Sequence, residues 1–533
     1  MKEDDNLLEL NPSQLRNHRN WTDAELPERV QTLVLSPVED ISLDAATQAL
    51  SELISAHEGL RSRLCHDDHG IPRQRVVSAG EALADIHDSI ETRPYEPGEN
   101  LWGTVPVQPR ESSVKAVFYL ERDRVAAIKL SLSHVFVDSL GKQAVTAHLA
   151  ELLRKSGSAA PGITPQASTY AKGNEHPDVQ ESTAYWKSVL ATAPRSCTYG
   201  AGERPETEQA QVSQVPLGRD TSDRLVATFR RLRVSPQTAW VAALSTVVSL
   251  LSGQHRHTFK TTHGNRALPA DFRAVAQIAQ PFFCVVDGDR EDTLRRRVEK
   301  SGEVLDAAAG KTMYDANALL DWLNSEERSS GSVFQPAFEV NYVPTIRRAH
   351  ASFLYGPAPE QLRNVTMRYD PAAGKPDLAL TIRHLPEPLL LLTVRGPLCA
   401  ERDARKLLDH GLTFLDALAE HPDLPISELG IPELGARGSL LYGHRSGVAI
   451  DPEMARRLVL SAPGVTSCEL TPRHMEDGSI ELHARLTTRG VPDERELRAQ
   501  LRRAQPWYAG SIVPDVLVIE PDGEGAGESK EGA

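Results

Sequence analysis

Apolar and polar positions alternate along residues 125–133, and apolar residues then return at helical spacing after residue 141. Alternation with a period of two predicts a β-strand, whereas recurrence every three or four residues predicts an α-helix. A second alternating run covers residues 114–120, and the charged residues between the two runs predict a polar turn. The pattern therefore predicts a β-hairpin whose second strand leads through a short loop into a helix.

Two residues with reactive side chains, His134 and Asp138, lie in this predicted loop. A strand end holds such groups rigidly while the loop exposes them, and an imidazole exchanges a proton near neutral pH without a large pKa shift. The spacing alone leaves two interpretations open. In one, a buried His134 makes a single backbone hydrogen bond and Asp138 caps the following helix. In the other, His134 takes part in catalysis, and Asp138 either faces it or holds the loop through an arginine.

The second half of the chain continues this alternation of strands and helices. A helix is predicted from Ser235, a favourable N-cap residue, through Pro236 to Gly253, a favourable C-cap residue. Residues 257–263 alternate as a strand, and we interpret the histidines on and beside it as belonging to a sheet edge rather than to a metal site. Further elements are predicted as strands at residues 338–342, 377–382 and 389–394 and as a helix at residues 401–418.

Residues 65–70 read Cys-His-Asp-Asp-His-Gly and contain side chains that bind metals. Asp and Gly also dominate tight turns, so a polar hairpin turn is the favoured interpretation. The five cysteines of the chain are scattered and include no Cys-x-x-Cys pair. This spacing predicts reduced thiols, not disulfides or zinc ligands.

The composition is that of an ordinary globular protein, with 40% apolar and 25% charged residues among 533. This length predicts roughly two to four domains. The formal net charge of −14 argues against a nucleic-acid partner. No stretch has the apolar length needed to span a bilayer, and the first residues are polar and acidic. We therefore expect a cytoplasmic protein with neither a secretory signal nor a membrane partner.

The residues Ser133-His134-Val-Phe-Val-Asp138-Ser139 resemble the His-His-x-x-x-Asp-Gly signature of condensation domains of nonribosomal peptide synthetases, which belong to the chloramphenicol-acetyltransferase-like superfamily. The resemblance implies that His134 is the catalytic histidine and that Asp138 is mainly structural. Two positions depart from the signature, because Ser133 replaces its first histidine and Ser139 its glycine. We expect Ser139 to cap a helix that begins at Leu140. We include Ser139 in the catalytic loop because backbone N–H groups near it are candidates to stabilise an oxyanion.

Other segments resemble parts of the same domains in the same order. Residues 56–64 are similar to the segment after their first helix, residues 185–186 to a helix between their lobes, and residues 425–429 to their closing segment. The implied fold is α/β, with two chloramphenicol-acetyltransferase-like lobes in a V-shaped pseudo-dimer. Residues 1–187 are the expected N-terminal lobe, and residues 188–432 are the expected C-terminal lobe.

The resemblance also assigns residues to the seam between these lobes. It implies that Arg266 forms a salt bridge with Asp138, and a buried carboxylate needs such a partner. The residues that it places along a substrate tunnel are Ser133, Phe338 and Asn341.

After a linker near residues 431–438 the pattern changes to helix, strand, turn, strand and helix. Residues 438–522 resemble the small C-terminal α+β subdomain of adenylate-forming enzymes, but the Gly-Lys pair with which it normally ends is missing. This implies a remnant without adenylating activity or, alternatively, a docking module for another synthetase protein. Few contacts usually cross such a linker, so we expect the module to be separable. Residues 523–533 are rich in Gly and Glu and are expected to be disordered.

These observations predict a stand-alone condensation enzyme of natural-product biosynthesis. It would join an acyl or aminoacyl thioester, held on the phosphopantetheine arm of an acyl or peptidyl carrier protein, to a small-molecule amine or aminoacyl acceptor. No metal or redox cofactor is implied. One alternative is an O- or N-acyltransferase that uses acyl-coenzyme A. The other is a degenerate condensation-like platform that recruits a partner enzyme, as similar domains of glycopeptide synthetases do. The lost histidine and glycine of the signature favour the platform, whereas His134, Asp138 and Arg266 favour an enzyme.

Overall fold

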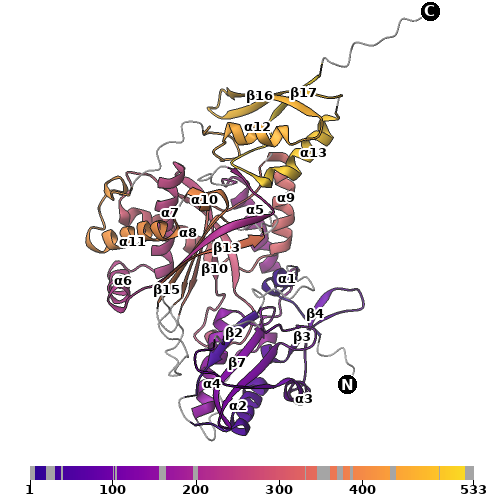
Figure 1. The fold of residues 1–533 in the computed structure, drawn as a ribbon, viewed down its shortest axis with the longest axis vertical. Helices are drawn as coiled ribbons and strands as arrows, with labels where there is room; N and C mark the ends of the chain where they lie inside the picture. The colour runs from indigo at the N-terminus through magenta and orange to yellow at the C-terminus, as the bar shows by residue number, and fades with distance from the viewer. Residues whose placement is uncertain are drawn as a thin grey trace, which may run out of the picture.

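Two lobes and a tail module follow one another along the longest axis of the computed structural model (Figure 1). The residues that the structure describes are 7–19, 30–37, 40–99, 101, 105–154, 164–195, 202–330, 332–344, 360–368, 376–383, 388–401, 403–431, 440–490 and 492–522. The segment 523–533, for which the sequence predicts disorder, lies outside them. Within this described part, no single helix is long and apolar enough to cross a membrane. The bent helix pair that meets the test by length and composition contains a core helix of the second lobe.

The first lobe is built on a four-stranded sheet in the order β2-β7-β6-β5. Its elements are β1 (Leu7–Glu9), α1 (Pro12–Arg19), β2 (Val30–Leu35), α2 (Leu43–Ala56), β3 (Ser62–His66), β4 (Pro72–Val76), α3 (Ala79–Ser89), β5 (Glu91–Pro94), β6 (Val114–Glu121), β7 (Arg124–Ser133) and α4 (Ser139–Arg154). Helical apolar spacing along α2 buries Leu50 and Leu53 in the core of this lobe, and Ser42 caps its first turn. The predicted hairpin is formed by β6 and β7, with Arg122 and Asp123 at positive φ in its turn.

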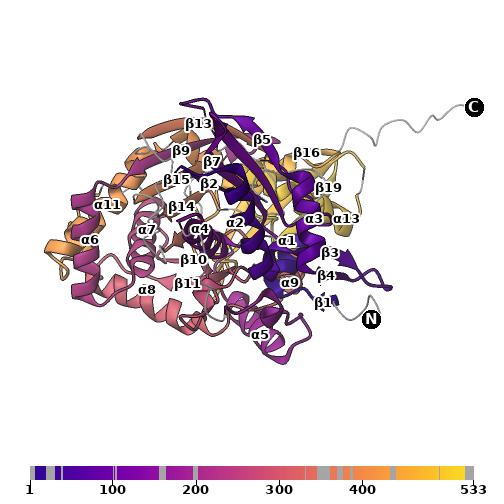
Figure 2. The ribbon, with the colours of Figure 1, turned by 90° about the horizontal axis from the view of Figure 1, so that it is seen from below.

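The second lobe contains a seven-stranded sheet in the order β11-β10-β12-β14-β15-β9-β13. Its elements are α5 (Pro177–Ala191), β8 (Gly202–Glu203), β9 (Thr207–Pro216), α6 (Arg219–Leu232), α7 (Pro236–Ser252), β10 (Arg256–His263), β11 (Gln280–Asp287), α8 (Leu294–Ala309), α9 (Ala316–Ser330), β12 (Phe338–Val343), β13 (Gln361–Arg368), β14 (Leu378–Arg383), β15 (Leu389–Arg395), α10 (Gly396–Glu401) and α11 (Ala404–Glu420). Helices α7, α8 and α11 pack together beside this sheet (Figure 2). The predicted caps of α7 are confirmed, because Ser235 accepts from Thr238 N and Gly253 ends the helix at φ +68°.

Strand β10 lies inside the seven-stranded sheet, between β11 and β12, so the prediction of a sheet edge is wrong. His257 on this strand is fully buried, and its Nε2 lies 3.2 Å from Ser245 Oγ on α7. Burial lowers the pKa of His257 to about 3. The histidines on this strand suggested a polar edge, but His257 is a neutral core residue that hydrogen-bonds to the central helix.

The lobes are joined by a long connection between β10 and β11, residues 264–279, which we call the crossing loop. This loop reaches into the first lobe, where Val275 is part of the apolar core. Gly59 allows this close approach, since a Cβ at that position would lie 2.1 Å from Val275 O. Asn11, the residue before α1, also contacts this loop, because its Nδ2 donates to Gln277 O at 3.0 Å. The seam is thus closed by backbone contacts that apolar periodicity does not reveal.

The tail module packs against the second lobe. Its elements are α12 (Pro452–Leu460), β16 (Val465–His474), β17 (Ile480–Thr488), α13 (Glu494–Ala504), β18 (Tyr508–Ala509) and β19 (Val516–Pro521). Strand β18 pairs with β8, and Arg204 N donates to Trp507 O at 2.7 Å. Arg195 N donates to Ser446 O at 3.0 Å. The expectation of few contacts across the linker is therefore wrong. The local pattern identifies the helices and strands of the module, but it does not contain the backbone pairings by which they dock.

Candidate active site

His134 stands where β7 ends, one residue after the last strand position. The chain turns sharply there, since Val137 N donates to Ser133 O at 3.0 Å. The turn brings Val137 O to 3.1 Å from His134 Nδ1. A carbonyl oxygen only accepts, so Nδ1 carries the hydrogen and Nε2 has a free lone pair. Asn17 of α1 donates from Nδ2 to His134 O at 2.9 Å and ties this turn to the seam.

The surroundings of His134 favour its neutral form. Burial lowers the pKa of His134 below its ordinary value, and the nearby Asp138 carboxylate opposes this only in part. The side chain is nevertheless partly exposed, and it lines a pocket of about 410 Å³ between the lobes. A neutral imidazole with a free Nε2 is able to accept a proton from a bound substrate.

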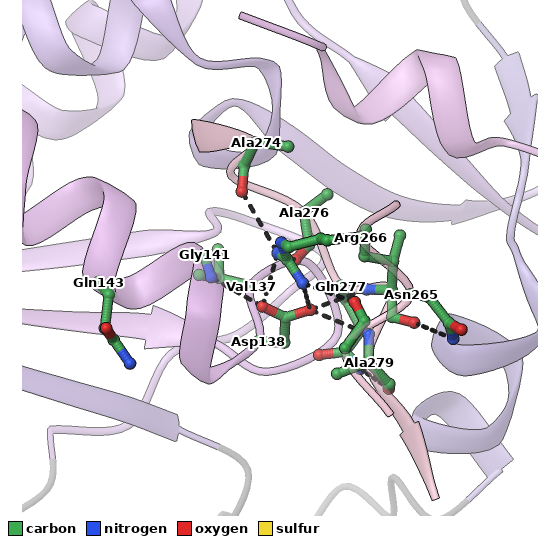
Figure 3. A network of polar contacts seen from close by, with 12 residues as sticks. Val137, Asp138, Gly141, Gln143, Asn265, Arg266, Ala274, Ala276, Gln277 and Ala279 are labelled. Carbon is green, nitrogen blue, oxygen red and sulfur yellow. Dashed lines mark hydrogen bonds and ion pairs between the residues drawn. The ribbon is translucent and has the colours of Figure 1, made fainter. Parts of the chain in front are cut away.

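Asp138 is the centre of a buried network that joins the two lobes (Figure 3). Its carboxylate receives both terminal nitrogens of Arg266, with Nη1 at 2.9 Å from Oδ2 and Nη2 at 2.8 Å from Oδ1. Backbone N–H groups add three more bonds, from Gly141 at 2.7 Å and from Ile278 and Ala279 of the crossing loop at 3.1 and 2.9 Å. The bond from Gly141 also makes Asp138 the cap of α4. Two of the three roles that the sequence left open for Asp138, helix cap and loop anchor through an arginine, are thus found together.

Asp138 is only 1% exposed, and the charge of Arg266 allows its carboxylate to stay ionised there. Burial on its own opposes ionisation, but the charge and hydrogen bonds of Arg266 outweigh it and lower the pKa of Asp138. Arg266 also donates to backbone oxygens of the crossing loop, among them Gly264 O at 2.9 Å. The pair therefore fixes the loop that carries His134 and the crossing loop against one another.

Ser139 does not cap the helix as the sequence predicted. It is the first residue of α4, and the cap is Asp138, one residue earlier. The Asp138 carboxylate accepts from Gly141 N at 2.7 Å and is held there by Arg266, so it takes the capping role that was expected of the serine hydroxyl. Ser139 has helical backbone geometry and lines the pocket, so a glycine is not needed at this position.

The structure separates the three residues that the sequence placed along the tunnel. Asn341 lines the pocket, but Phe338 is fully buried in the core of the second lobe, where it stacks on Phe259 at 5.2 Å between ring centroids. Residues three apart on a strand point to opposite faces, so Phe338 and Asn341 cannot share one. Ser133 is also buried, and its Oγ accepts from Val135 N at 3.4 Å instead of bordering the pocket.

Several residues that line the pocket were not among the site residues predicted from the sequence. On β10, Lys260 alternates with the buried Phe259 and forms an ion pair with Glu339 of β12, with Nζ 3.3 Å from Oε2. Glu339 in turn alternates with Phe338, so a strict period-two reading of both strands would have found this polar face. Arg16, which lines the pocket from α1, had no such signal.

No group of three or more His, Cys, Asp or Glu side chains in the described ranges is arranged to hold a metal ion. The sequence cluster at residues 65–70 forms the turn between β3 and β4, as predicted, with Gly70 at φ +75°. Asp67 accepts from the N–H groups of His69 and Ile71 and so closes this turn.

Known proteins share this two-lobed arrangement. The family model of the condensation domain matches residues 28–441. No curated protein sequence matches the chain. The fold is similar to that of the first condensation domain of the calcium-dependent antibiotic synthetase, with a TM-score of 0.59 and 16% identity over 79% of this chain and 98% of that one.

Two further solved structures have the same fold. The SgcC5 protein from Streptomyces globisporus gives a TM-score of 0.56 at 17% identity, over 78% of this chain and 100% of its own. The X-domain from teicoplanin biosynthesis gives 0.55 at 16%, over 79% and 97%. These likenesses confirm the predicted mixed α/β fold with two chloramphenicol-acetyltransferase-like lobes. Since the family model covers most of the two lobes, the chain belongs to the condensation-domain family.

Proposed function

We propose that the protein is a condensation enzyme that joins an acyl or aminoacyl group to an amine. The acyl group would arrive as a thioester on the phosphopantetheine arm of a carrier protein. The observation that carries the proposal is the state of His134, whose Nδ1–H is bound to Val137 O while Nε2 is left without a hydrogen in a pocket between the lobes. The intact pair of Asp138 and Arg266 supports it, because it holds this histidine in place.

The chemistry follows from this geometry. The amine nitrogen attacks the thioester carbon, a C–N bond forms and the C–S bond breaks. His134 Nε2 takes the proton that the amine loses and passes it to the departing thiolate, which leaves as the free thiol. Holding the two substrates together in one pocket supplies much of the rate. This reaction needs no metal or redox cofactor.

One observation favours a second candidate, the non-catalytic platform. Ser133 replaces the first histidine of the signature, and its side chain is buried away from the pocket. The reacting geometry around His134 does not depend on that side chain, so we give priority to the enzyme. The acyl-coenzyme A alternative differs from the proposal in the carrier of the acyl group, and its acceptor is an alcohol or an amine.

The test uses the full chain with the same acyl groups loaded either on carrier proteins or on coenzyme A, together with a panel of amines. Mass spectrometry reports the amide product and the freed thiol. We expect product from the carrier-bound donor, and a loss of about a hundredfold or more with His134→Ala. His69→Ala, in the exposed turn between β3 and β4, is the matched control and should keep full turnover. Unchanged turnover with His134→Ala would refute the proposal. Product from coenzyme A alone would establish the first alternative, and no product from either donor would favour the platform.

We also propose that the tail module is a remnant of an adenylate-forming subdomain without adenylating activity. What supports this is its order of helix, two strands, helix and two strands, together with the missing Gly-Lys pair. The full chain should then show no ATP–pyrophosphate exchange with any amino acid. Exchange above background would contradict it.

A further inference from the structure

Arg16 places a cation beside His134 at the seam of the lobes. It lies on α1, next to Asn17, whose side chain holds the backbone oxygen of His134 at 2.9 Å. The same helix is tied to the second lobe through Ser13 Oγ, 2.9 Å from Gln280 Oε1. Arg16 is therefore carried by an element anchored on both sides of the pocket that it lines.

The charges around the pocket are not balanced. Arg266 is neutralised by Asp138, and Lys260 by Glu339. Arg16 is the third cationic side chain of the lining, and the described residues contribute no third carboxylate to it. Its Nη2 donates to the neutral Asn17 Oδ1 at 3.2 Å, and among the described residues its buried Nε has no hydrogen-bond partner.

The Arg16 side chain is partly exposed but its Nε is buried, so an anion beside it would offset part of the cost of taking the guanidinium out of water. Burial lowers the pKa of Arg16, while the nearby Glu339 and Tyr314 oppose this. An arginine does not lose its proton in proteins, so the cost of burial remains until a counter-charge is supplied. Arginine presents its N–H groups in a planar fork that fits a carboxylate with two parallel hydrogen bonds.

We propose that Arg16 binds a carboxylate of the amine acceptor, so that the acceptor is an amino acid with a free carboxyl group. This inference rests on the proposed function for its reaction, but the anion site itself is a property of the pocket. The phosphate of a phosphopantetheine arm lies at the far end of that arm from the thioester, so it does not reach a group beside His134. The carboxyl group of the donor is consumed in its own thioester. The acceptor is the substrate that retains one.

Binding of two small probes tests the site without requiring turnover. Benzoate and benzamide have nearly the same shape and differ in charge, and their dissociation constants are measured by isothermal titration with the full chain. We expect benzoate to bind at least about tenfold more tightly than benzamide, which is the scale of a charge-assisted hydrogen bond. Arg16→Gln should remove this preference, and Arg16→Lys should keep only part of it. Arg19→Gln, on the same helix but outside the pocket and paired with Asp321, is the matched control and should leave the preference unchanged.

The outcomes separate this inference from the proposed function. A wild-type chain that binds both probes alike, or binds neither, refutes the carboxylate site, and so does a preference that survives Arg16→Gln. Amide formation with amines that lack a carboxyl group, at the same rate as with matched amino acids, refutes it while leaving the condensation chemistry intact. If His134→Ala keeps normal turnover but Arg16→Gln removes the benzoate preference, the proposed function fails and the anion site stands.

Discussion

Removing Arg266 should leave the most strongly bound carboxylate of the seam without its counter-charge. Arg266→Ala takes away two of the five hydrogen bonds described for Asp138, together with the only positive side chain bonded to it among the described residues. Breaking one side of a buried pair costs about 3–5 kcal/mol. The loss of unfolding free energy has an upper limit, because a buried Asp138 can take up a proton instead of remaining charged. Protonating a carboxyl group of ordinary pKa at neutral pH costs about 4 kcal/mol.

This upper limit gives the variant a characteristic pH dependence. In the wild type the pKa of Asp138 is lowered, so the pair stabilises the fold above the ordinary Asp pKa, and this contribution is lost as the pH falls through the lower folded value. In Arg266→Ala the folded pKa of Asp138 should be raised, so the variant gains stability as the pH falls from neutrality. The difference in unfolding free energy should shrink by up to about 1.4 kcal/mol per pH unit between about pH 7 and the ordinary Asp pKa.

Urea denaturation checks both statements, with fluorescence of the buried Trp186 and Trp240 as the signal from the second lobe. Asp138→Asn should cost a similar amount, and the double variant Asp138→Asn/Arg266→Ala should cost clearly less than the sum, because neither charge is left alone. Unchanged midpoints in both single variants would mean that the pair does not hold the lobes together. A cost that does not change with pH would refute the protonation argument.

Four further outcomes are expected. The acidic limb of the pH–rate profile should lie below the ordinary imidazole pKa, because the lowered pKa of His134 keeps Nε2 free at lower pH; a limb above it would contradict this. Gly59→Ala should lower the melting midpoint and the turnover together, because its Cβ would meet a backbone oxygen of the crossing loop. The control Gly80→Ala, in open space on α3, should leave the melting midpoint unchanged or raise it. A melting midpoint that falls with Gly80→Ala but not with Gly59→Ala would refute the close approach. Ser139→Gly should keep turnover within about tenfold and lower stability only slightly, since the cap is Asp138, and a large gain in turnover would argue for the platform. Truncation before residue 440 should lower the melting midpoint of the second lobe, and an unchanged midpoint would show that the docked tail adds nothing to it.

Much of the fold could be predicted because its signals are local. The helix α7 follows from Ser235, Pro236 and Gly253, since capping and chain reversal act within a few residues. The β3–β4 turn follows in the same way from the Asp and Gly between residues 65 and 70. The family signature located His134 and Asp138, the wider resemblance located Arg266, and the structure places Asp138 and Arg266 in one ion pair.

What could not be predicted depends on contacts between distant segments. The hydrogen bonds from Ile278 and Ala279 to Asp138 use backbone groups, which leave no trace in the side-chain pattern. They explain why Asp138 and not Ser139 caps α4. Arg16 was missed because a polar helix with an arginine resembles any solvated helix until its neighbours are known. The placement of Phe338 along the tunnel could have been rejected from the sequence alone, because strand alternation puts Phe338 and Asn341 on opposite faces.

The tail module is docked on the second lobe through backbone hydrogen bonds. The Arg204 side chain is 2% exposed and bonds to Asp377 Oδ2 at 2.6 Å, while its backbone N–H donates to Trp507 O. Arg204 is therefore bonded to the second lobe through its side chain and to the tail through its backbone. A tail that moved away from the second lobe would have to break this bond and the β18–β8 pairing. The backbone groups exposed in this way would then need new hydrogen-bond partners. We expect a module held by such contacts to stay on the second lobe and to stabilise it. If the tail is the remnant proposed above, its missing Gly-Lys pair and its docked interface agree with a structural role beside the second lobe.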